Sequence, residues 1–76
     1  MVKTEFITID LLAGDTFYKL DVEVHAYSRE PYDFFLGDIF LEHTDIDVFD
    51  LMSSENRDKL REMVNDYIQQ GKATWI

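Results

Sequence analysis

The 76-residue chain contains no cysteine, one proline and three glycines that never cluster. Without cysteine it forms neither disulfides nor thiolate metal sites, which fits a reducing compartment. Isolated glycines exclude a glycine-rich phosphate-binding loop. No segment approaches the roughly 18 consecutive apolar residues of a membrane span, and the first residues lack the pattern of a signal peptide. We therefore expect one small, soluble, cytoplasmic domain over residues 1–76.

Basic residues are scarce in the first two thirds of the chain. Residues 1–50 carry twelve acidic and three basic side chains, which accounts for the whole net charge of −9. Residues 30–50 hold seven acids and no lysine or arginine. Because nucleic-acid binding depends on basic side chains that neutralise phosphates, we expect no direct contact with nucleic acid. The acidic field favours a basic protein partner instead. A hydrophobic content of 46% excludes intrinsic disorder despite this charge.

Two segments, residues 5–11 and 18–27, alternate between apolar and polar side chains, as half-buried strands do. Turn-forming residues at 13–16 predict that the two strands form an antiparallel hairpin. Pairing residues whose numbers sum to 29 matches the apolar faces and sets Asp10 opposite Lys19 as a cross-strand ion pair. The apolar side of the hairpin is expected to consist of Ile7, Ile9, Leu11, Tyr18, Leu20, Val22, Val24 and Ala26.

Pro31 interrupts the alternation and predicts a connection over residues 29–33. The apolar residues that follow are expected to bend at Gly37. Residues 38–43 then read as a third strand, with Phe40 facing outward.

A C-terminal helix is predicted because apolar residues recur at i, i+3, i+4, i+7 and i+8 over residues 60–68. Ser53 or Ser54 can cap its first turn, and Gly71 suits the left-handed position after its last turn. Trp75 near the chain end is expected to dock on the domain. The order hairpin, third strand, helix predicts an α+β fold, with one antiparallel sheet packed against one amphipathic helix in two layers.

The sequence contains little that indicates a metal site or a catalytic site. His25 and His43 do not supply the three or four converging ligands of a zinc site. The acidic run that begins at Asp45 partly matches a calcium loop, but Asp50 and Asn56 occupy the positions that require glycine and glutamate. No pair of carboxylates and no nucleophile motif stands out. We therefore expect no metal site, no cofactor and no enzymatic activity.

Exposed aromatic side chains among acids are the main candidate for function, because apolar surface patches mark interfaces. Acids two positions apart in a strand, such as Asp21 and Glu23, lie about 7 Å apart on one face. DNA carries one charge every ~3.4 Å of axial rise on each strand, so carboxylates spaced on that scale are candidates to mimic a phosphate track. The aromatic residues expected on the surface are Phe6, Phe17, Tyr27, Tyr32, Phe40 and one of Phe34 or Phe35. The expected partner-binding residues are Asp21, Glu23, Tyr27, Phe40, Glu42, Asp45 and Asp47.

These residues favour a non-enzymatic acidic binding protein that engages a basic protein. In its sharpest form, the hypothesis is an inhibitor that blocks a nucleic-acid-binding host protein by charge mimicry. The alternative is a structural or self-associating protein that forms a homo-oligomer through exposed aromatics. The third hypothesis, an enzyme subunit or small hydrolase, lacks a recognisable group of catalytic residues. The structural alternative for the aromatic residues is that the tail with Trp75, or the loop over residues 32–36, covers their face.

The strand over residues 18–26 and the stretch Asp47-Val48-Phe49-Asp50-Leu51-Met52-Ser53 ahead of the helix resemble short acidic β–β–β–α proteins encoded by phages and prophages. The resemblance spans most of the chain without a specific motif. It implies a protein that binds and inhibits host proteins, and it assigns a role to no individual residue.

Overall fold

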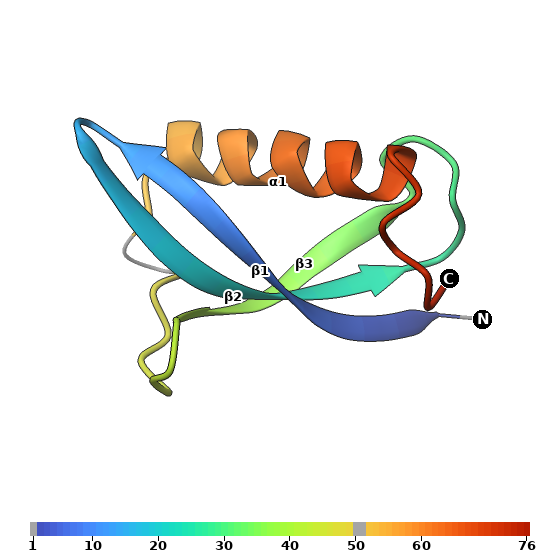
Figure 1. Ribbon diagram of the computed structural model, residues 1–76, viewed down its shortest axis with the longest axis horizontal. Helices are drawn as coiled ribbons and strands as arrows, with labels where there is room; N and C mark the ends of the chain where they lie inside the picture. The colour runs from blue at the N-terminus through green and yellow to red at the C-terminus, as the bar shows by residue number, and fades with distance from the viewer. Residues whose placement is uncertain (1, 50–51) are drawn as a thin grey trace.

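The computed structural model describes residues 2–49 and 52–76 of the chain. Three strands form one antiparallel sheet in the order β1-β2-β3, and α1 lies across one face of that sheet (Figure 1). This arrangement confirms the expected two-layer α+β fold. Within the described residues, no helix has both the length and the apolar character needed to cross a membrane. The elements are β1 (Lys3–Ala13), β2 (Thr16–Ala26), β3 (Phe34–Leu41) and α1 (Ser54–Gln69).

The β1–β2 hairpin has the register expected from the sequence, with Ile7 opposite Val22 and Asp10 opposite Lys19. Its turn consists of two residues, 14 and 15. Gly14 has a φ of 67°, and the residue after it has no positive φ. This combination is that of a type II′ turn, whose twist matches the twist of the flanking strands.

The prediction of an ion pair between Asp10 and Lys19 across the hairpin is wrong. Among the described residues, the salt bridges do not include Asp10 or Lys19. Both side chains are exposed, so solvent screening leaves little gain from holding two flexible chains together. The nearby Asp21 carboxylate instead accepts a hydrogen bond of 3.0 Å from the Thr8 hydroxyl.

The third strand begins earlier than the expected residues 38–43, because the bend at Gly37 lies inside the strand. Val22 pairs with Ile39 and Val24 pairs with Leu36, so the register shifts between the two pairs. A bulge of this kind inserts an extra residue and lets pairing continue on both sides.

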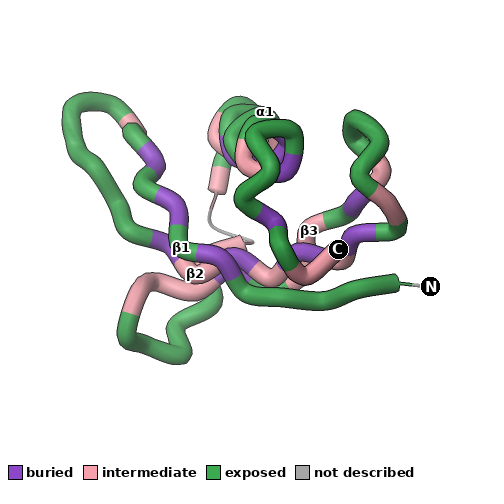
Figure 2. The backbone as a smooth tube through the Cα atoms, turned by 45° about the vertical axis from the view of Figure 1, so that its right-hand side comes forward, coloured by how far each residue is buried: buried purple, intermediate pink, exposed green. Residues whose placement is uncertain are grey.

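The hydrophobic core fills the space between α1 and the sheet, and the buried stretches gather beneath the helix while the hairpin tip stays exposed (Figure 2). Leu60, Val64 and Ile68 form the buried stripe of α1. Met63 is 36% exposed and Tyr67 is half-buried, since both line a cleft beside β1. The sheet and tail contribute Ile7, Ile9, Leu11, Leu20, Val22, Val24, Ala26, Phe34, Ile39 and Ala73.

Local hydrogen bonds cap both ends of α1, as the sequence predicts. The Ser53 hydroxyl accepts a bond of 3.1 Å from the Asn56 N–H at the first turn. At the other end, Gly71 has a φ of 77°. The N–H groups of residues 71 and 72 donate to the carbonyls of residues 68 and 67, at 3.0 and 3.3 Å. These two hydrogen bonds together form a Schellman motif.

The tail docks on the helix side of the sheet and leaves the opposite face open. Trp75 and Ile76 pack against the core cluster, and Ala73 is only 1% exposed. Docking of Trp75 is therefore confirmed, and the tail does not cover the aromatic face. Within the described residues, the buried Trp75 Nε1 has no hydrogen-bond partner, a loss typically worth about 1–3 kcal/mol.

Candidate protein-binding face

We call the sheet surface opposite α1 the outer face. It is defined by the strand alternation, which turns every second side chain away from the core. Residues paired directly across the strands share a face, so the register groups the outer-face residues into rows. The described outer-face residues used below are Thr4, Phe6, Thr8, Asp21, Glu23, His25, Phe35 and Phe40.

Two aromatic pairs stand on this face. The Phe6 and Phe40 rings stack with centroids 6.1 Å apart. The Phe35 and Tyr27 rings lie 5.9 Å apart and are tilted by 41°. Phe6, Phe35 and Tyr27 are 48%, 44% and 51% exposed. These three rings place large apolar groups in solvent on one side of the sheet, and Asp21 lies in register with Phe40.

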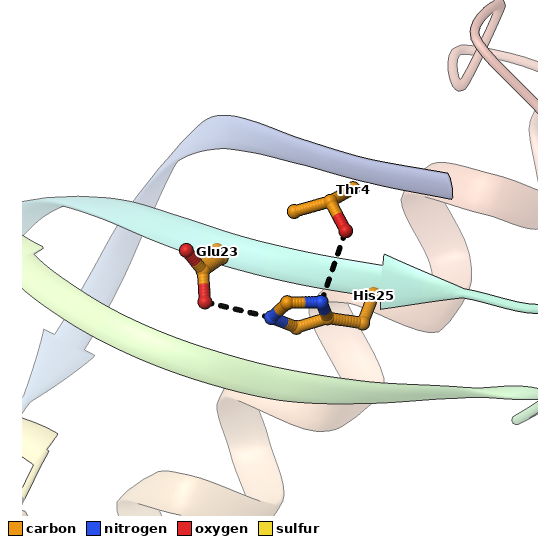
Figure 3. A network of polar contacts seen from close by, with 3 residues as sticks. All are labelled: Thr4, Glu23 and His25. Carbon is orange, nitrogen blue, oxygen red and sulfur yellow. Dashed lines mark hydrogen bonds and ion pairs between the residues drawn. The ribbon is translucent and has the colours of Figure 1, made fainter. Parts of the chain in front are cut away.

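Glu23 and His25 are held in place by a polar network that joins the strands (Figure 3). His25 Nε2 lies 2.7 Å from Glu23 Oε1, and His25 Nδ1 lies 3.0 Å from the Thr4 hydroxyl. A carboxylate accepts hydrogen bonds, so Nε2 donates to Glu23, and in the neutral imidazole Nδ1 accepts from the Thr4 hydroxyl. The His25 ring also stacks on Phe35 at 4.5 Å with an interplanar angle of 6°.

Gly37 supplies the space for this network. A methyl group at Gly37 would collide with the Glu23 carboxylate and lie 2.7 Å from His25 Nε2. The side chains therefore lie over the bulge of β3, which explains why the residue opposite Glu23 is glycine.

A hydroxyl, an imidazole and a carboxylate are also the residue types of an acyl-transfer triad, but the geometry differs. In the triad, the hydroxyl meets Nε2 and the carboxylate meets Nδ1. Here the two ring nitrogens are exchanged. None of the three side chains lines the clefts found along residues 2–49 and 52–76. The network thus orients a half-buried carboxylate beside aromatic rings.

Three of the residues expected from the sequence, Asp21, Glu23 and Phe40, come together on the outer face. Tyr27 follows β2 and leans on Phe35. Glu42 follows β3, and its carboxylate lies 3.3 Å from the Nε2 atom of the adjacent His43.

Asp45 and Asp47 lie in the loop after β3. Asp45 is exposed. The Asp47 carboxylate accepts a hydrogen bond of 2.9 Å from the Phe49 N–H, which stabilises the local turn. The backbone of Asp47 pairs with Phe40 through an isolated bridge. The loop thus extends from the far edge of the sheet, beside β3.

The sequence interpretation did not identify Thr4 and His25 as parts of the site. The alternation of β2 places His25 on the same face as Glu23, but the partner strand that brings Thr4 to His25 depends on register. Among the described residues, no group of three or more acidic or histidine side chains is placed to hold a metal ion. Asp50, the last acid of the calcium-like run, lies outside the described residues.

A second constrained site is the connection to β3, where Tyr32 has a φ of 60°. Its N–H donates to Asn65 Oδ1 at 3.0 Å, and its hydroxyl donates to Glu62 Oε2 at 2.7 Å. The hydrogen bond to Glu62, followed by desolvation and the charges of Glu62 and Asp66, raises the pKa of Tyr32 above its usual value of 10.0. These contacts tie the connection to α1 and hold a backbone conformation that non-glycine residues rarely adopt.

Comparison with models of known protein families, with curated proteins and with solved structures found no match for this chain. Its function is therefore inferred from its own residues.

Proposed function

We propose that this chain is a non-enzymatic binding protein that engages a basic protein through its outer face. The observation that carries this proposal is the group of three exposed aromatic rings beside Asp21 and Glu23. Among the described residues, neither carboxylate forms a salt bridge with lysine or arginine. Aromatic anchors supply affinity at such interfaces, and charges around them supply association rate and specificity.

The partner in this proposal is a nucleic-acid-binding protein, and the chain inhibits it by occupying its basic surface. The net charge of −9 supports this form of the proposal, because it repels nucleic acid and attracts the proteins that bind it. Acids continue from the half-buried Asp21 and Glu23 of the outer face to the exposed Asp45 and Asp47 in the loop after β3. In this proposal the inhibited protein is a host protein in the cytoplasm.

Self-association through the exposed aromatics is the second candidate. The exposure of Phe6 and Phe35 favours it. Two copies that each carry a charge of −9 repel one another, so self-association requires screening by salt, whereas binding to a basic protein weakens in salt.

In the test, the protein is immobilised. The probe is the set of proteins from the source cell that bind DNA-cellulose, and the amount captured is measured. Phe6→Ala is expected to weaken capture at least about tenfold, the loss typical of an interface anchor. Tyr18→Ala is the matched control, since Tyr18 is 45% exposed on the side of β2 opposite the outer face and lines neither cleft of the β1 edge. Free duplex DNA is expected to displace the captured protein.

The charges are tested separately. Asp21→Asn with Glu23→Gln is expected to slow association and flatten its salt dependence. Asp15→Asn with Asp58→Asn removes the same charge elsewhere and is expected to have a smaller effect. An equal loss of association rate in the two double variants would contradict the proposed face. Unchanged capture by the Phe6→Ala variant would contradict it as well. A size that grows with concentration and with salt would support self-association.

A further inference from the structure

One edge of the sheet is open. In a two-residue hairpin, Ala13 and Thr16 form the hydrogen-bonded pair next to the turn, so the odd-numbered residues of β1 bond to β2. The even-numbered residues, from Thr4 to Leu12, direct their backbone N–H and C=O groups away from the sheet. Among the described residues, these outward groups have no hydrogen-bond partner in the turns, loops and side chains that surround β1.

The other edge of the sheet is partly closed by the chain itself. The Val48 N–H donates to the Ile39 carbonyl at 2.8 Å, and the Leu41 N–H donates to the Ile46 carbonyl at 3.1 Å. The residues after β3 therefore cover the C-terminal part of that strand. An uncovered, long edge strand such as β1 is a template for pairing with another chain.

A groove follows the open edge between β1 and α1. Two adjoining clefts of about 300 and 400 Å³ share Asp10 and Met63 in their walls. The first continues to Tyr67, and the second continues to Leu12 and Phe17. The groove thus provides apolar side chains below an edge whose backbone groups lack partners.

We propose that an extended segment of a basic protein adds to β1 as a fourth strand. Alternate side chains of a strand point to opposite sides. One set is apolar and enters the groove over Met63 and Tyr67. The other set is basic and lies over the outer face beside Phe6, whose ring attracts a cation, and within reach of Asp21.

The acidic charge around the β1 edge favours a basic segment over a second copy of this chain as the added strand. Glu62 and Asp66 line the α1 wall of the groove and Asp10 lies on the edge strand, while the ammonium group of Lys59 is 3.7 Å from Glu55. Lys72, at one end of the groove, is the remaining base. Two copies with a charge of −9 each would repel at the edge, whereas a lysine-rich strand gains from the same field. The inference rests on the proposed function, because it specifies how the basic partner is held.

The experiment uses a ten-residue peptide of alternating lysine and valine, blocked at both ends, as probe. Amide exchange followed by NMR should show new protection at Phe6, Thr8 and Asp10 when the peptide is added. Thr8→Pro removes one outward N–H and keeps the β1–β2 bonds, because proline is tolerated at a strand edge. It should weaken binding at least tenfold, and Thr8→Val, which keeps the N–H, should bind within twofold of the original chain.

A peptide with alternate N-methylated amides keeps the charge and loses the strand bonds, and it should not bind even if Thr8→Pro fails to fold. Equal binding of both peptides, or unchanged binding by a folded Thr8→Pro variant, would overturn strand addition. Protected β1 amides in a dimer without peptide would assign the edge to a second copy and also overturn it. If Phe6→Ala abolishes capture of the cellular partner and Thr8→Pro does not, only the strand addition fails. If the peptide binds at the edge but the outer-face variants leave capture unchanged, only the proposed function fails.

Discussion

At the scale of single residues, the position that most constrains the outer face carries no side chain. Gly37 lies in the bulge of β3, and the Glu23 carboxylate and His25 ring occupy the volume that a larger residue would need. Glycine at this position permits a charged group to remain half-buried on an open sheet. The carboxylate is thereby fixed beside Phe35 through the stacked His25 ring.

We predict that Gly37→Ala displaces Glu23 and breaks its contact with His25. The expected cost is about 1 kcal/mol, seen as a fall in Tm of roughly 4–8 °C for a domain of this size. Thermal unfolding and the His25 ring signals in NMR measure both effects. In the Glu23→Ala background the same glycine substitution should cost less, because the closer collision partner is gone and only the contact with His25 remains. An equal cost in both backgrounds would mean that the collision with Glu23 is not the cause.

At the scale of elements, the connection between β2 and β3 is held by α1 more than by its own residues. Tyr32 donates two hydrogen bonds to helix side chains, and its carbonyl accepts one of 3.4 Å from Arg61. The Arg61 guanidinium also lies over the rings of Tyr32 and Phe34, at 5.7 and 5.0 Å from their centroids. The start of β3 is therefore positioned by the helix that packs on the sheet.

We predict that the stability supplied by the Tyr32 hydroxyl disappears in alkaline solution. The bond to Glu62 favours the neutral phenol, so the pKa of Tyr32 is raised above 10.0 in the folded state. A raised pKa means that this contribution is fully present below about pH 10 and is lost as the pH rises through the folded-state pKa. In urea unfolding, Tyr32→Phe should be less stable than the original chain at pH 7, and the difference should shrink above pH 10.

Tyr27→Phe serves as the control, because the hydrogen bonds found among the described side chains include the Tyr32 hydroxyl with Glu62 and do not include the Tyr27 hydroxyl. Its effect on stability should be small at both pH values. A difference between Tyr32→Phe and the original chain that stays constant to pH 11 would contradict the role of the Glu62 bond.

At the scale of the whole molecule, repulsion among acids opposes folding. Residues 30–50 hold seven acids. Within the described part of this segment, no acid forms a salt bridge with lysine or arginine. Asp33 accepts a hydrogen bond of 2.6 Å from Ser28, and Asp38 and Asp45 are exposed. The charge is therefore dispersed in solvent rather than neutralised by pairing.

We predict that sodium chloride raises the Tm between low and physiological ionic strength, because the Debye length falls from about 30 Å at 0.01 M to about 8 Å at 0.15 M. Thermal unfolding followed by circular dichroism measures the increase. Asp38→Asn with Asp45→Asn should raise the Tm at low salt and reduce the further gain from salt. A Tm that does not respond to salt would show that the acids repel one another too weakly to affect folding.

Local patterns in the sequence were sufficient for the hairpin and the helix. Alternation set the apolar faces of β1 and β2, and a two-residue turn that begins at Gly14 selected one of the registers that match these faces. The helix stripe and its two ends depend on residues within a few positions of one another, so Ser53 and Gly71 were identified before any tertiary contact was known. The expected ion pair failed because alignment in a register does not bring two exposed charges together.

Tertiary structure decided the third strand and the outer face. Phe34 and Phe35 are equally apolar, and only pairing with β2 turns the first inward and the second outward. The tail took the helix side because Ala73 and Trp75 found apolar partners there. The contact between Thr4 and His25 joins residues 21 positions apart. Sequence determined what depends on neighbours along the chain, whereas contacts between distant segments depend on how the whole chain encloses its core.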